Sequence, residues 1–284
     1  MRQTGRALIG YYGKAEALAV LRGTVGPEEP DGRLTEQWER MRRAVSMRQR
    51  FAAADPTEQP PAEIADALAA VQQRTDVQSS FTGLAWRVAV VDLNKPILSF
   101  QKVIRTEEAM DRVKSAQQDD WESLVNICLP PGQETQLVGA FDPTQNAFTA
   151  SSVNPNLRIG QFGSWDIQGQ GGTSDKIFGF TLSLGVSFVQ VVHYRDRWMV
   201  RDGYHRLYGL MSRGIRKVPC IVVEAADFTQ TGAGRPGFFD YEVLYSERPP
   251  LVQDFLSEEW SAEVPMQSVT RIVRIRGEEF IVPT

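Results

Sequence analysis

Hydrophobic residues recur with helical spacing near the start of the chain and with strand-like spacing in much of the rest. The clearest helical pattern has Leu34, Trp38, Met41 and Val45 separated by three or four positions. Three stretches have helical composition and are separated by connectors rich in proline and glycine: residues 7–21, 34–51 and 62–73. The pattern predicts a helical N-terminal region over residues 1–75.

The remainder of the chain mixes the two patterns. Residues 84–105 alternate as strands, residues 106–119 have a helix-start signal and helical composition, and the apolar run 124–129 is typical of another strand. We therefore expect an α+β protein with four regions. They are the helical region 1–75, an α/β connecting region 76–147, a motif-bearing domain 148–226 and a strand-rich extension 227–284.

The most informative stretch lies between residues 188 and 224. Residues 188–194 and 198–201 are rich in β-branched and aromatic residues and flank a charged turn, which predicts a hairpin. Apolar residues then recur at helical spacing up to Gly214, and residues 218–224 are typical of a buried strand. The sequence Asp202-Gly203-Tyr204-His205-Arg206 therefore stands where a strand passes into a helix.

The residue types in this motif suit an anion site at a helix start. Asp202 is a favourable N-cap, and Gly203 lets a ligand approach the backbone closely. The N–H groups of a first helical turn have no acceptor within the helix, so they can bind phosphate. His205 would add a titratable group and Arg206 a guanidinium fork. The alternative is an ordinary surface turn, because Asp-Gly is a common turn signal.

The succession of hairpin, D-G-x-H-R motif, helix closed by glycine and V-P-x-I-V-V strand resembles the ParB/sulfiredoxin superfamily. Asn154, Pro155 and Arg158 look like the segment that opens such domains, and residues 182–185 look like the end of the helix before the hairpin. The resemblance covers about residues 148–226. It implies a mixed sheet with helices and a Gly-x-x-Arg turn that grips nucleotide phosphates.

Departures from this superfamily narrow the expected chemistry. Sulfiredoxins carry a reactive cysteine immediately before the His-Arg pair, where this chain has Tyr204, so thiol-dependent catalysis is not expected. ParB partition proteins carry G-E-R-R at this place, and no helix-turn-helix is recognisable after the domain. The D-G-x-H-R form is closer to the branch that includes free-serine kinases and several bacterial proteins.

Charge is distributed unevenly, although the net charge of the chain is only −4. Residues 195–217 contain seven basic and two acidic residues, whereas residues 240–263 contain seven acidic residues and one basic residue. A local basic cluster in an acidic chain favours a small phosphorylated ligand over nonspecific DNA binding. Arg201 belongs to this cluster and is a further candidate for ligand binding. For basic residues outside the motif, a solvated face without a partner is the alternative.

Composition predicts a cytoplasmic protein without a membrane partner. No apolar run approaches the ~20 residues of a membrane helix, and the N-terminal apolar stretch is too short for a secretory signal. Cys128 and Cys220 have apolar neighbours, so buried reduced thiols are expected. The two cysteines and two histidines are widely separated, and no metal site is predicted from them.

These features lead to one main hypothesis, a nucleotide- or phosphate-binding protein that hydrolyses a nucleotide or transfers a phosphoryl group to a small acceptor. A nucleoside triphosphatase or a small-molecule kinase would do this, with Mg²⁺ bound alongside a nucleoside triphosphate as a compatible cofactor. The expected catalytic residues are Asp202, His205 and Arg206, and the expected ligand-binding residues are Gly203, Tyr204, Arg201 and Arg158. One alternative is a non-catalytic nucleotide-sensing or DNA-associated binding module, and a weaker one is a nuclease. The sequence leaves the nucleotide, the acceptor and the oligomeric state open.

Overall fold

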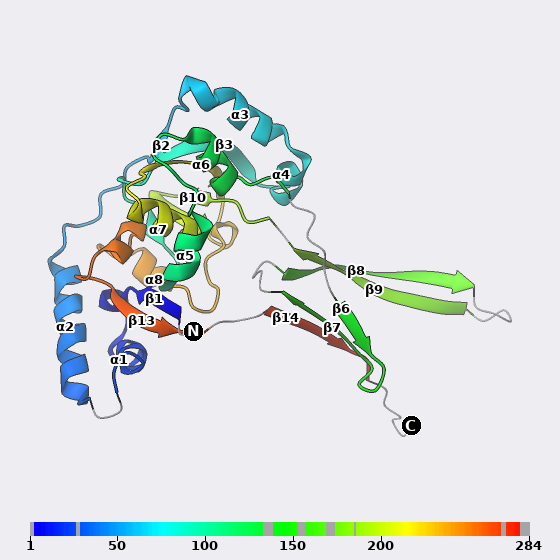
Figure 1. Ribbon diagram of the computed structural model, residues 1–284, viewed down its shortest axis with the longest axis horizontal. Helices are drawn as coiled ribbons and strands as arrows, with labels where there is room; N and C mark the ends of the chain where they lie inside the picture. The colour runs from blue at the N-terminus through cyan, green and yellow to red at the C-terminus, as the bar shows by residue number, and fades with distance from the viewer. Residues whose placement is uncertain are drawn as a thin grey trace. The chain divides into compact units, whose positions relative to one another are not determined.

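A computed structural model describes residues 3–26, 29–132, 139–152, 157–168, 174–184, 186–267 and 271–278 (Figure 1). The chain forms two compact units. Unit 1 consists of Met1–Pro131 and Ser187–Gln267, and unit 2 consists of Gly132–Val186 and Ser268–Thr284. The expected α+β class is confirmed, because helices and a mixed sheet share unit 1.

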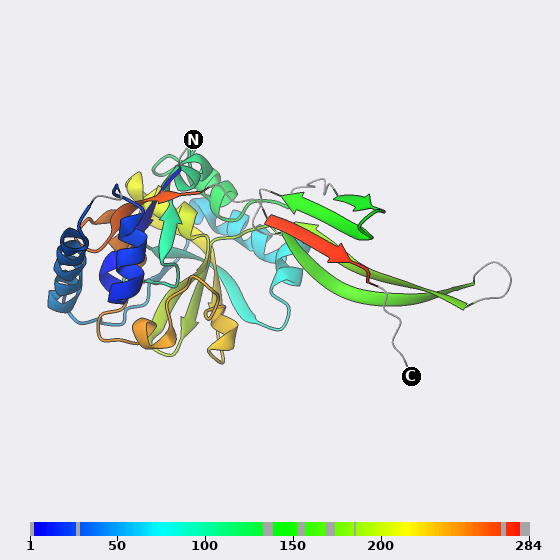
Figure 2. The same ribbon diagram turned by 90° about the horizontal axis from the view of Figure 1, so that it is seen from below.

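The largest sheet of unit 1 has the strand order β2-β3-β12-β10-β11-β4 (Figure 1 and Figure 2). These strands are β2 (Thr57–Glu58), β3 (Ala85–Asp92), β4 (Leu98–Ser99), β10 (Gln190–Tyr194), β11 (Arg197–Asp202) and β12 (Lys217–Glu224). Strands β10 and β11 form the predicted hairpin, and β12 runs parallel to β10 after the crossover through helix α7 (Tyr204–Ser212). The apolar run in β12 is buried throughout because β12 lies inside the sheet, between β3 and β10.

Helices pack on this sheet and on one another. Helix α3 (Ala62–Gln73) packs on β3, α6 (Trp121–Cys128) packs on β12, and α5 (Thr106–Arg112) packs on α7. Gly209 permits the last contact, because a Cβ there would lie 2.6 Å from the Ala109 carbonyl oxygen. The other helices of unit 1 are α1 (Lys14–Arg22), α2 (Asp31–Met47), α4 (Thr75–Ser80), α8 (Tyr241–Leu244) and the short 3-10 helices η1 (Ile9–Tyr11), η2 (Thr229–Thr231) and η3 (Val252–Leu256).

The N-terminal helices are part of unit 1 and do not form a separate region. Strand β1 (Gln3–Ala7) lies between β13 (Ala262–Met266) and β5 (Val103–Arg105) in a second sheet. Arg48, at the end of α2, donates to the Asp254 carboxylate over 2.8 Å, and Tyr11 donates to the same oxygen over 2.6 Å. The predicted boundary near residue 75 is therefore wrong, because strand pairing and a buried ion pair join residues 1–75 to the C-terminal part of the chain.

Unit 2 consists of strands among the described residues. One sheet contains β6 (Gly139–Asp142), β7 (Ala147–Ser152) and β14 (Arg271–Arg276), and a second consists of β8 (Leu157–Gln168) and β9 (Ser174–Leu184). The predicted domain 148–226 is thus divided between the two units. The physical reason is that β7 pairs with β6 and β14, and β8 pairs with β9, whereas residues after Ser187 join the six-stranded sheet.

Several local predictions also need correction. The run 124–129, predicted as a strand, belongs to α6, because Asp120 caps the Ser123 N–H and the i,i+4 pair Leu124 and Cys128 is buried. Residues 182–184, expected at a helix end, lie in β9. The expected extension 227–284 is less strand-rich than predicted, since η2, α8 and η3 precede β13. Residues 154–156 of the expected opening segment lie outside the described residues.

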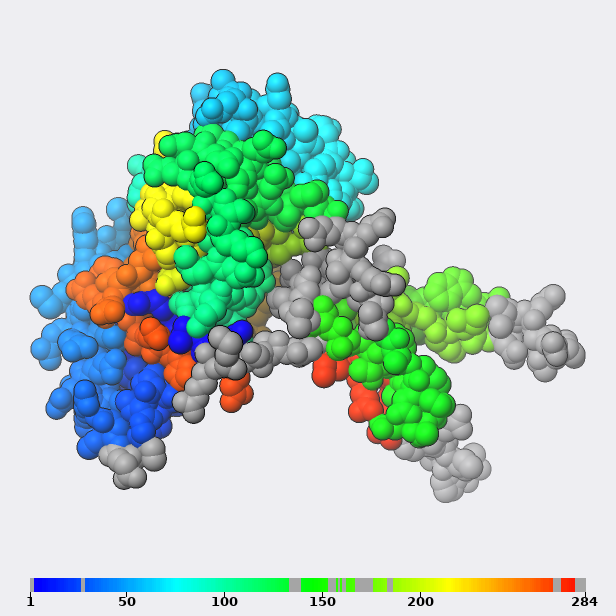
Figure 3. Space-filling view, in the orientation of Figure 1, coloured from blue at the N-terminus to red at the C-terminus, as the bar shows by residue number. Residues whose placement is uncertain are grey.

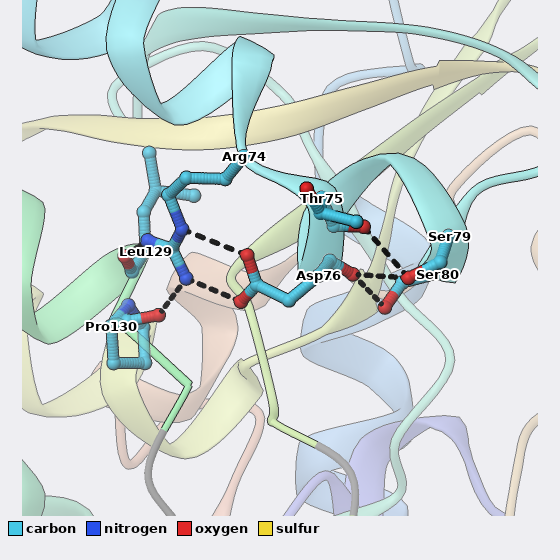
Figure 4. Close-up of polar contacts among 7 residues, drawn as sticks. All are labelled: Arg74, Thr75, Asp76, Ser79, Ser80, Leu129 and Pro130. Carbon is cyan, nitrogen blue, oxygen red and sulfur yellow. Dashed lines mark hydrogen bonds and ion pairs between the residues drawn. The ribbon is translucent and has the colours of Figure 1, made fainter.

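Arg74 contacts both the segment where the chain leaves unit 1 and the segment where it returns. Figure 4 shows its contacts with the first of these, at Leu129 and Pro130. Its guanidinium donates to the carbonyls of Leu129 and Pro130 over 2.9 and 2.7 Å and lies 5.7 Å from the centre of the Phe188 ring. It also forms a two-point ion pair with Asp76, which lowers the pKa of that carboxyl group. These contacts hold residues 129–130 beside residue 188 in unit 1.

In the part of the chain that the structure describes, no helix combines the length and apolar character needed to cross a membrane.

Candidate functional site

The motif occupies the predicted turn between β11 and α7. Gly203 has a φ of 89° and a ψ of 15°, and a Cβ there would lie 2.9 Å from the Val189 Cα. Glycine is therefore required for both conformation and space. Asp202 accepts a hydrogen bond from the Gly203 N–H over 2.7 Å and another from the Ser187 hydroxyl over 3.1 Å. Asp202 orders the turn through these hydrogen bonds, but the N-cap residue of α7 is Gly203 and not Asp202 as predicted.

Arg206 is buried and its donors are directed at the protein. One terminal nitrogen, Nη1, donates to the carbonyl oxygens of Ile127 over 3.0 Å and Ser187 over 2.6 Å. The other, Nη2, donates to the Ser187 hydroxyl over 2.7 Å, while Nε has no hydrogen-bond partner among the described residues. Burial lowers the pKa of this guanidinium. The contacts join α7 to the end of α6 and to the segment entering β10, so they are those of a residue that holds the fold.

His205 faces helix α5. Burial lowers its pKa from 6.5 to about 4, while the charges of Glu108 and Asp202 act to raise it and those of Arg112 and Arg105 to lower it. The imidazole is therefore neutral near pH 7. Its Nε2 atom is buried without a hydrogen-bond partner among the described residues.

Two arginines lie close to Gly232. Arg201 donates from Nη1 to the Gln190 side-chain oxygen over 2.9 Å, and its pKa is lowered by burial and then by the positive charge of Arg235. Gly232 lies between them with a φ of 80°. A Cβ at that glycine would be 3.5 Å from the Arg201 Nε and 4.0 Å from the Arg235 Nη2. Neither guanidinium forms an ion pair with a described carboxylate.

The loop that carries Arg235 is fixed next to the motif. Phe238 donates its N–H to the Arg235 carbonyl over 3.1 Å, and its ring lies 6.1 Å from the ring of Tyr204 in an edge-on arrangement. On its other side Phe238 stacks on Phe100, with ring centres 5.9 Å apart. The Tyr204 ring thus packs on the loop, and the loop places the guanidinium of Arg235 near that of Arg201. We call Arg201, Arg235 and the Gly232 backbone the arginine pair site.

The predicted site residues do not form one site. Asp202, Gly203 and Arg206 form an internal hydrogen-bonded cluster with Ser187. Arg201 belongs to the arginine pair site, Tyr204 packs on the loop that carries Arg235, and His205 belongs to neither group. Arg158 lies in β8 of unit 2, opposite Ser183, and its side chain lies outside what the structure describes. Sequence reasoning missed Gln190, Gly232 and Arg235. The glycine-rich run Gly232-Ala233-Gly234-Arg235 was the signal that could have identified the loop.

Cys128 and Cys220 are buried and free, as predicted. Burial raises the pKa of Cys128 to about 12 and raises that of Cys220 as well. Within the described residues, no group of three or more histidine, cysteine, aspartate or glutamate side chains could hold a metal ion.

Comparison with known proteins identifies no relative. No protein-family model matches the chain, and neither a curated protein nor a solved structure is significantly similar to it.

Proposed function

We propose that this protein binds a small phosphate-bearing ligand, a nucleotide in the first place, at the arginine pair site beside the start of α7. The observation that carries the proposal is the pair of guanidinium groups around Gly232, neither of which forms an ion pair with a described carboxylate, although Asp202 lies close enough to Arg201 to act on its charge. Two like charges at close range repel each other, and an anion between them would remove that repulsion. Guanidinium groups also match the geometry of phosphate oxygens with two parallel hydrogen bonds.

The backbone around the pair supports the same ligand class. The first turn of α7 begins after a glycine, so no cap side chain at that residue satisfies its N–H groups. The partial positive charge at a helix start attracts anions. The D-G-x-H-R resemblance to the ParB/sulfiredoxin superfamily points in the same direction, since that family binds nucleotide phosphates at this turn.

We propose ligand binding without catalysis, as in the nucleotide-sensing alternative, because the side chains expected to be catalytic are engaged elsewhere in the protein. Asp202 and Arg206 are hydrogen-bonded to Ser187, and His205 faces α5. A general acid or base must come within hydrogen-bond reach of a substrate atom. These three side chains would have to leave their present contacts to do so.

Isothermal titration calorimetry tests the proposal with pyrophosphate, ATP and CTP, each with and without Mg²⁺. We expect Arg235→Ala to weaken binding by about 10- to 150-fold, the equivalent of 1.5–3 kcal/mol for a hydrogen bond to a charged group. Arg43→Ala is the matched control, since Arg43 is an exposed arginine of α2 far along the chain from the site. Wild-type affinity in Arg235→Ala, or no binding by the wild-type protein, would contradict the proposal. Release of inorganic phosphate in the same samples would favour the enzyme hypothesis instead.

A further inference from the structure

Two guanidinium groups supply the positive charge that a ligand can reach at the arginine pair site. Helices α5, α6 and α7 are visible together on the face of unit 1 that Figure 3 shows. Arg206 is directed into this helix layer, at the carbonyl oxygen of Ile127 in α6, so its charge is committed to the fold. Among the described residues, the charges that act on Arg201 are those of Arg235 and Asp202. The class of ligand therefore depends on what Arg201 and Arg235 can bind together.

Gln190 determines which part of the Arg201 guanidinium is free. The Nη1 atom donates to the Gln190 side-chain oxygen over 2.9 Å, whereas Nε and Nη2 donate to no other described residue. The N–H groups of Nε and Nη2 are parallel, and this edge of a guanidinium makes two-point contacts with phosphate oxygens. Its Nε end is 3.5 Å from the position that a Cβ at Gly232 would occupy. Gln190 thus presents the two-point edge of Arg201 towards Gly232.

Arg235 approaches the same position from the loop. Its Nη2 atom is 4.0 Å from where a Gly232 Cβ would be, and its exposed guanidinium forms no hydrogen bond or ion pair with a described residue. The Arg201 Nε and the Arg235 Nη2 cannot be farther apart than their two distances to this position added together. A single phosphate group bridges donors up to about 8 Å apart, because charge-assisted hydrogen bonds are about 2.8 Å long. The gap beside Gly232 therefore matches one phosphate group.

A phosphate monoester satisfies both guanidinium groups with a single phosphorus atom. It has three terminal oxygens, so two two-point contacts can share one of them, and it carries nearly two negative charges at neutral pH. A phosphate diester has two terminal oxygens and one charge, which leaves N–H groups of one guanidinium without an acceptor. In a triphosphate, the further phosphate groups would extend beyond the pair, where no other described cation acts on Arg201. They would add charge without adding a partner.

We propose that the arginine pair site selects a phosphate monoester dianion, with its one phosphate group held between Arg201 and Arg235. A nucleoside monophosphate is the form of nucleotide that this selection favours. Gln190 is a positioning residue, because it acts on the ligand through Arg201. The inference rests on the proposed function, since it specifies the ligand of the same site. The selection requires the second negative charge, so it is lost when the monoester takes up a proton near its second pKa of about 6.

Titration calorimetry of the full chain without Mg²⁺ tests the proposal with AMP and cyclic AMP, which share base and sugar but differ as monoester and diester. At a pH of about 7.5 we expect AMP to bind at least roughly tenfold more tightly than cyclic AMP and within about threefold of ATP. At a pH of about 5 the ratio of the AMP and cyclic AMP affinities should fall about tenfold, because most AMP is then a monoanion. Cyclic AMP keeps its charge over this range, so it reports any change in the protein itself.

Gln190→Leu tests the positioning role with the same ligands. Without the acceptor for Nη1, the Arg201 edge is no longer fixed, so the ratio of the AMP and cyclic AMP affinities should fall at least about threefold. Gln73→Leu, at an exposed glutamine of α3, is the control and should keep the wild-type ratio. A Gln190 variant that melts earlier but keeps the ratio would show that Gln190 is only structural.

The outcomes separate this inference from the proposed function. Equal affinities for AMP and cyclic AMP, or ATP bound more than about tenfold more tightly than AMP, would overturn the selection of a monoester while phosphate binding at the site stands. If AMP, ATP and pyrophosphate all fail to bind, the proposed function itself is wrong and the inference fails with it.

Discussion

Replacing Arg206 distinguishes a residue that holds the fold from one that grips a ligand. The guanidinium makes three hydrogen bonds, to the carbonyls of Ile127 and Ser187 and to the Ser187 hydroxyl. Hydrogen bonds to charged groups contribute about 1.5–3 kcal/mol each, and a buried acceptor left unsatisfied costs about 1–3 kcal/mol. The ammonium group of a lysine cannot reproduce the planar fork of the guanidinium, so we expect Arg206→Lys to lose about two of these three hydrogen bonds. We expect a loss of roughly 2–4 kcal/mol, a large part of the 5–15 kcal/mol by which domains are usually stable.

Urea denaturation measures this loss as a shift of the unfolding midpoint. With a denaturant slope of about 1–3 kcal/mol per molar, the midpoint of Arg206→Lys should fall by roughly 0.7–4 M. Arg201→Lys is the matched control, since Arg201 is only partly buried and has one described hydrogen bond, to Gln190. It should keep a midpoint close to that of the wild-type protein and lose affinity for pyrophosphate. If Arg206→Lys instead unfolds at the wild-type midpoint and fails to bind pyrophosphate, Arg206 is a ligand residue and our reasoning is refuted.

Three further predictions concern the turn and its surroundings. The pKa of His205 is lowered from 6.5 to about 4 in the folded protein. Between pH 6.5 and pH 4 the unfolded chain therefore binds a proton on this imidazole that the folded chain does not bind, so the free energy of unfolding should fall as the pH drops through this range. His205→Gln should flatten that part of the stability curve in urea titrations at each pH, and an unchanged curve would show that His205 is not the group responsible. Gly203→Ala should destabilise by about 2–4 kcal/mol, since left-handed strain adds to a clash with Val189, whereas Gly214→Ala has the strain but open space and should cost about 1 kcal/mol. Equal losses in thermal melts of these two variants would count against the packing argument. Finally, Cys128 and Cys220 should react with a thiol reagent only after denaturation, because both are buried with raised pKa values, and rapid labelling of the native protein would contradict their placement.

Local patterns predicted the part of the fold that surrounds the motif. The β10–β11 hairpin, helix α7 and strand β12 follow from β-branched runs, a charged turn and a glycine at the helix end, all of which act within a few residues. Helix α3 was predicted with its observed bounds for the same reason, since its apolar spacing is regular and prolines precede it. Such signals do not depend on distant partners.

Long-range pairing determined what the sequence did not predict. Residues 3–7 form a strand only because β13 and β5 lie on either side, and neither strand is close to them in the sequence. The interruption of unit 1 by residues 132–186 likewise depends on which strands pair, and alternation alone cannot show this. The positions of the candidate site residues also depend on contacts between distant segments. Arg206 was predicted to face a ligand, but its partners Ile127 and Ser187 come from segments that only the tertiary fold brings together.

A crystal structure of the full chain with pyrophosphate tests the central claim most directly. We expect the pyrophosphate to contact the guanidinium groups of Arg201 and Arg235 next to the Gly232 backbone, while Arg206 keeps its hydrogen bonds to Ile127 and Ser187. Pyrophosphate bound to a displaced Arg206 side chain, or bound only at a place remote from the β11–α7 turn, would contradict the account.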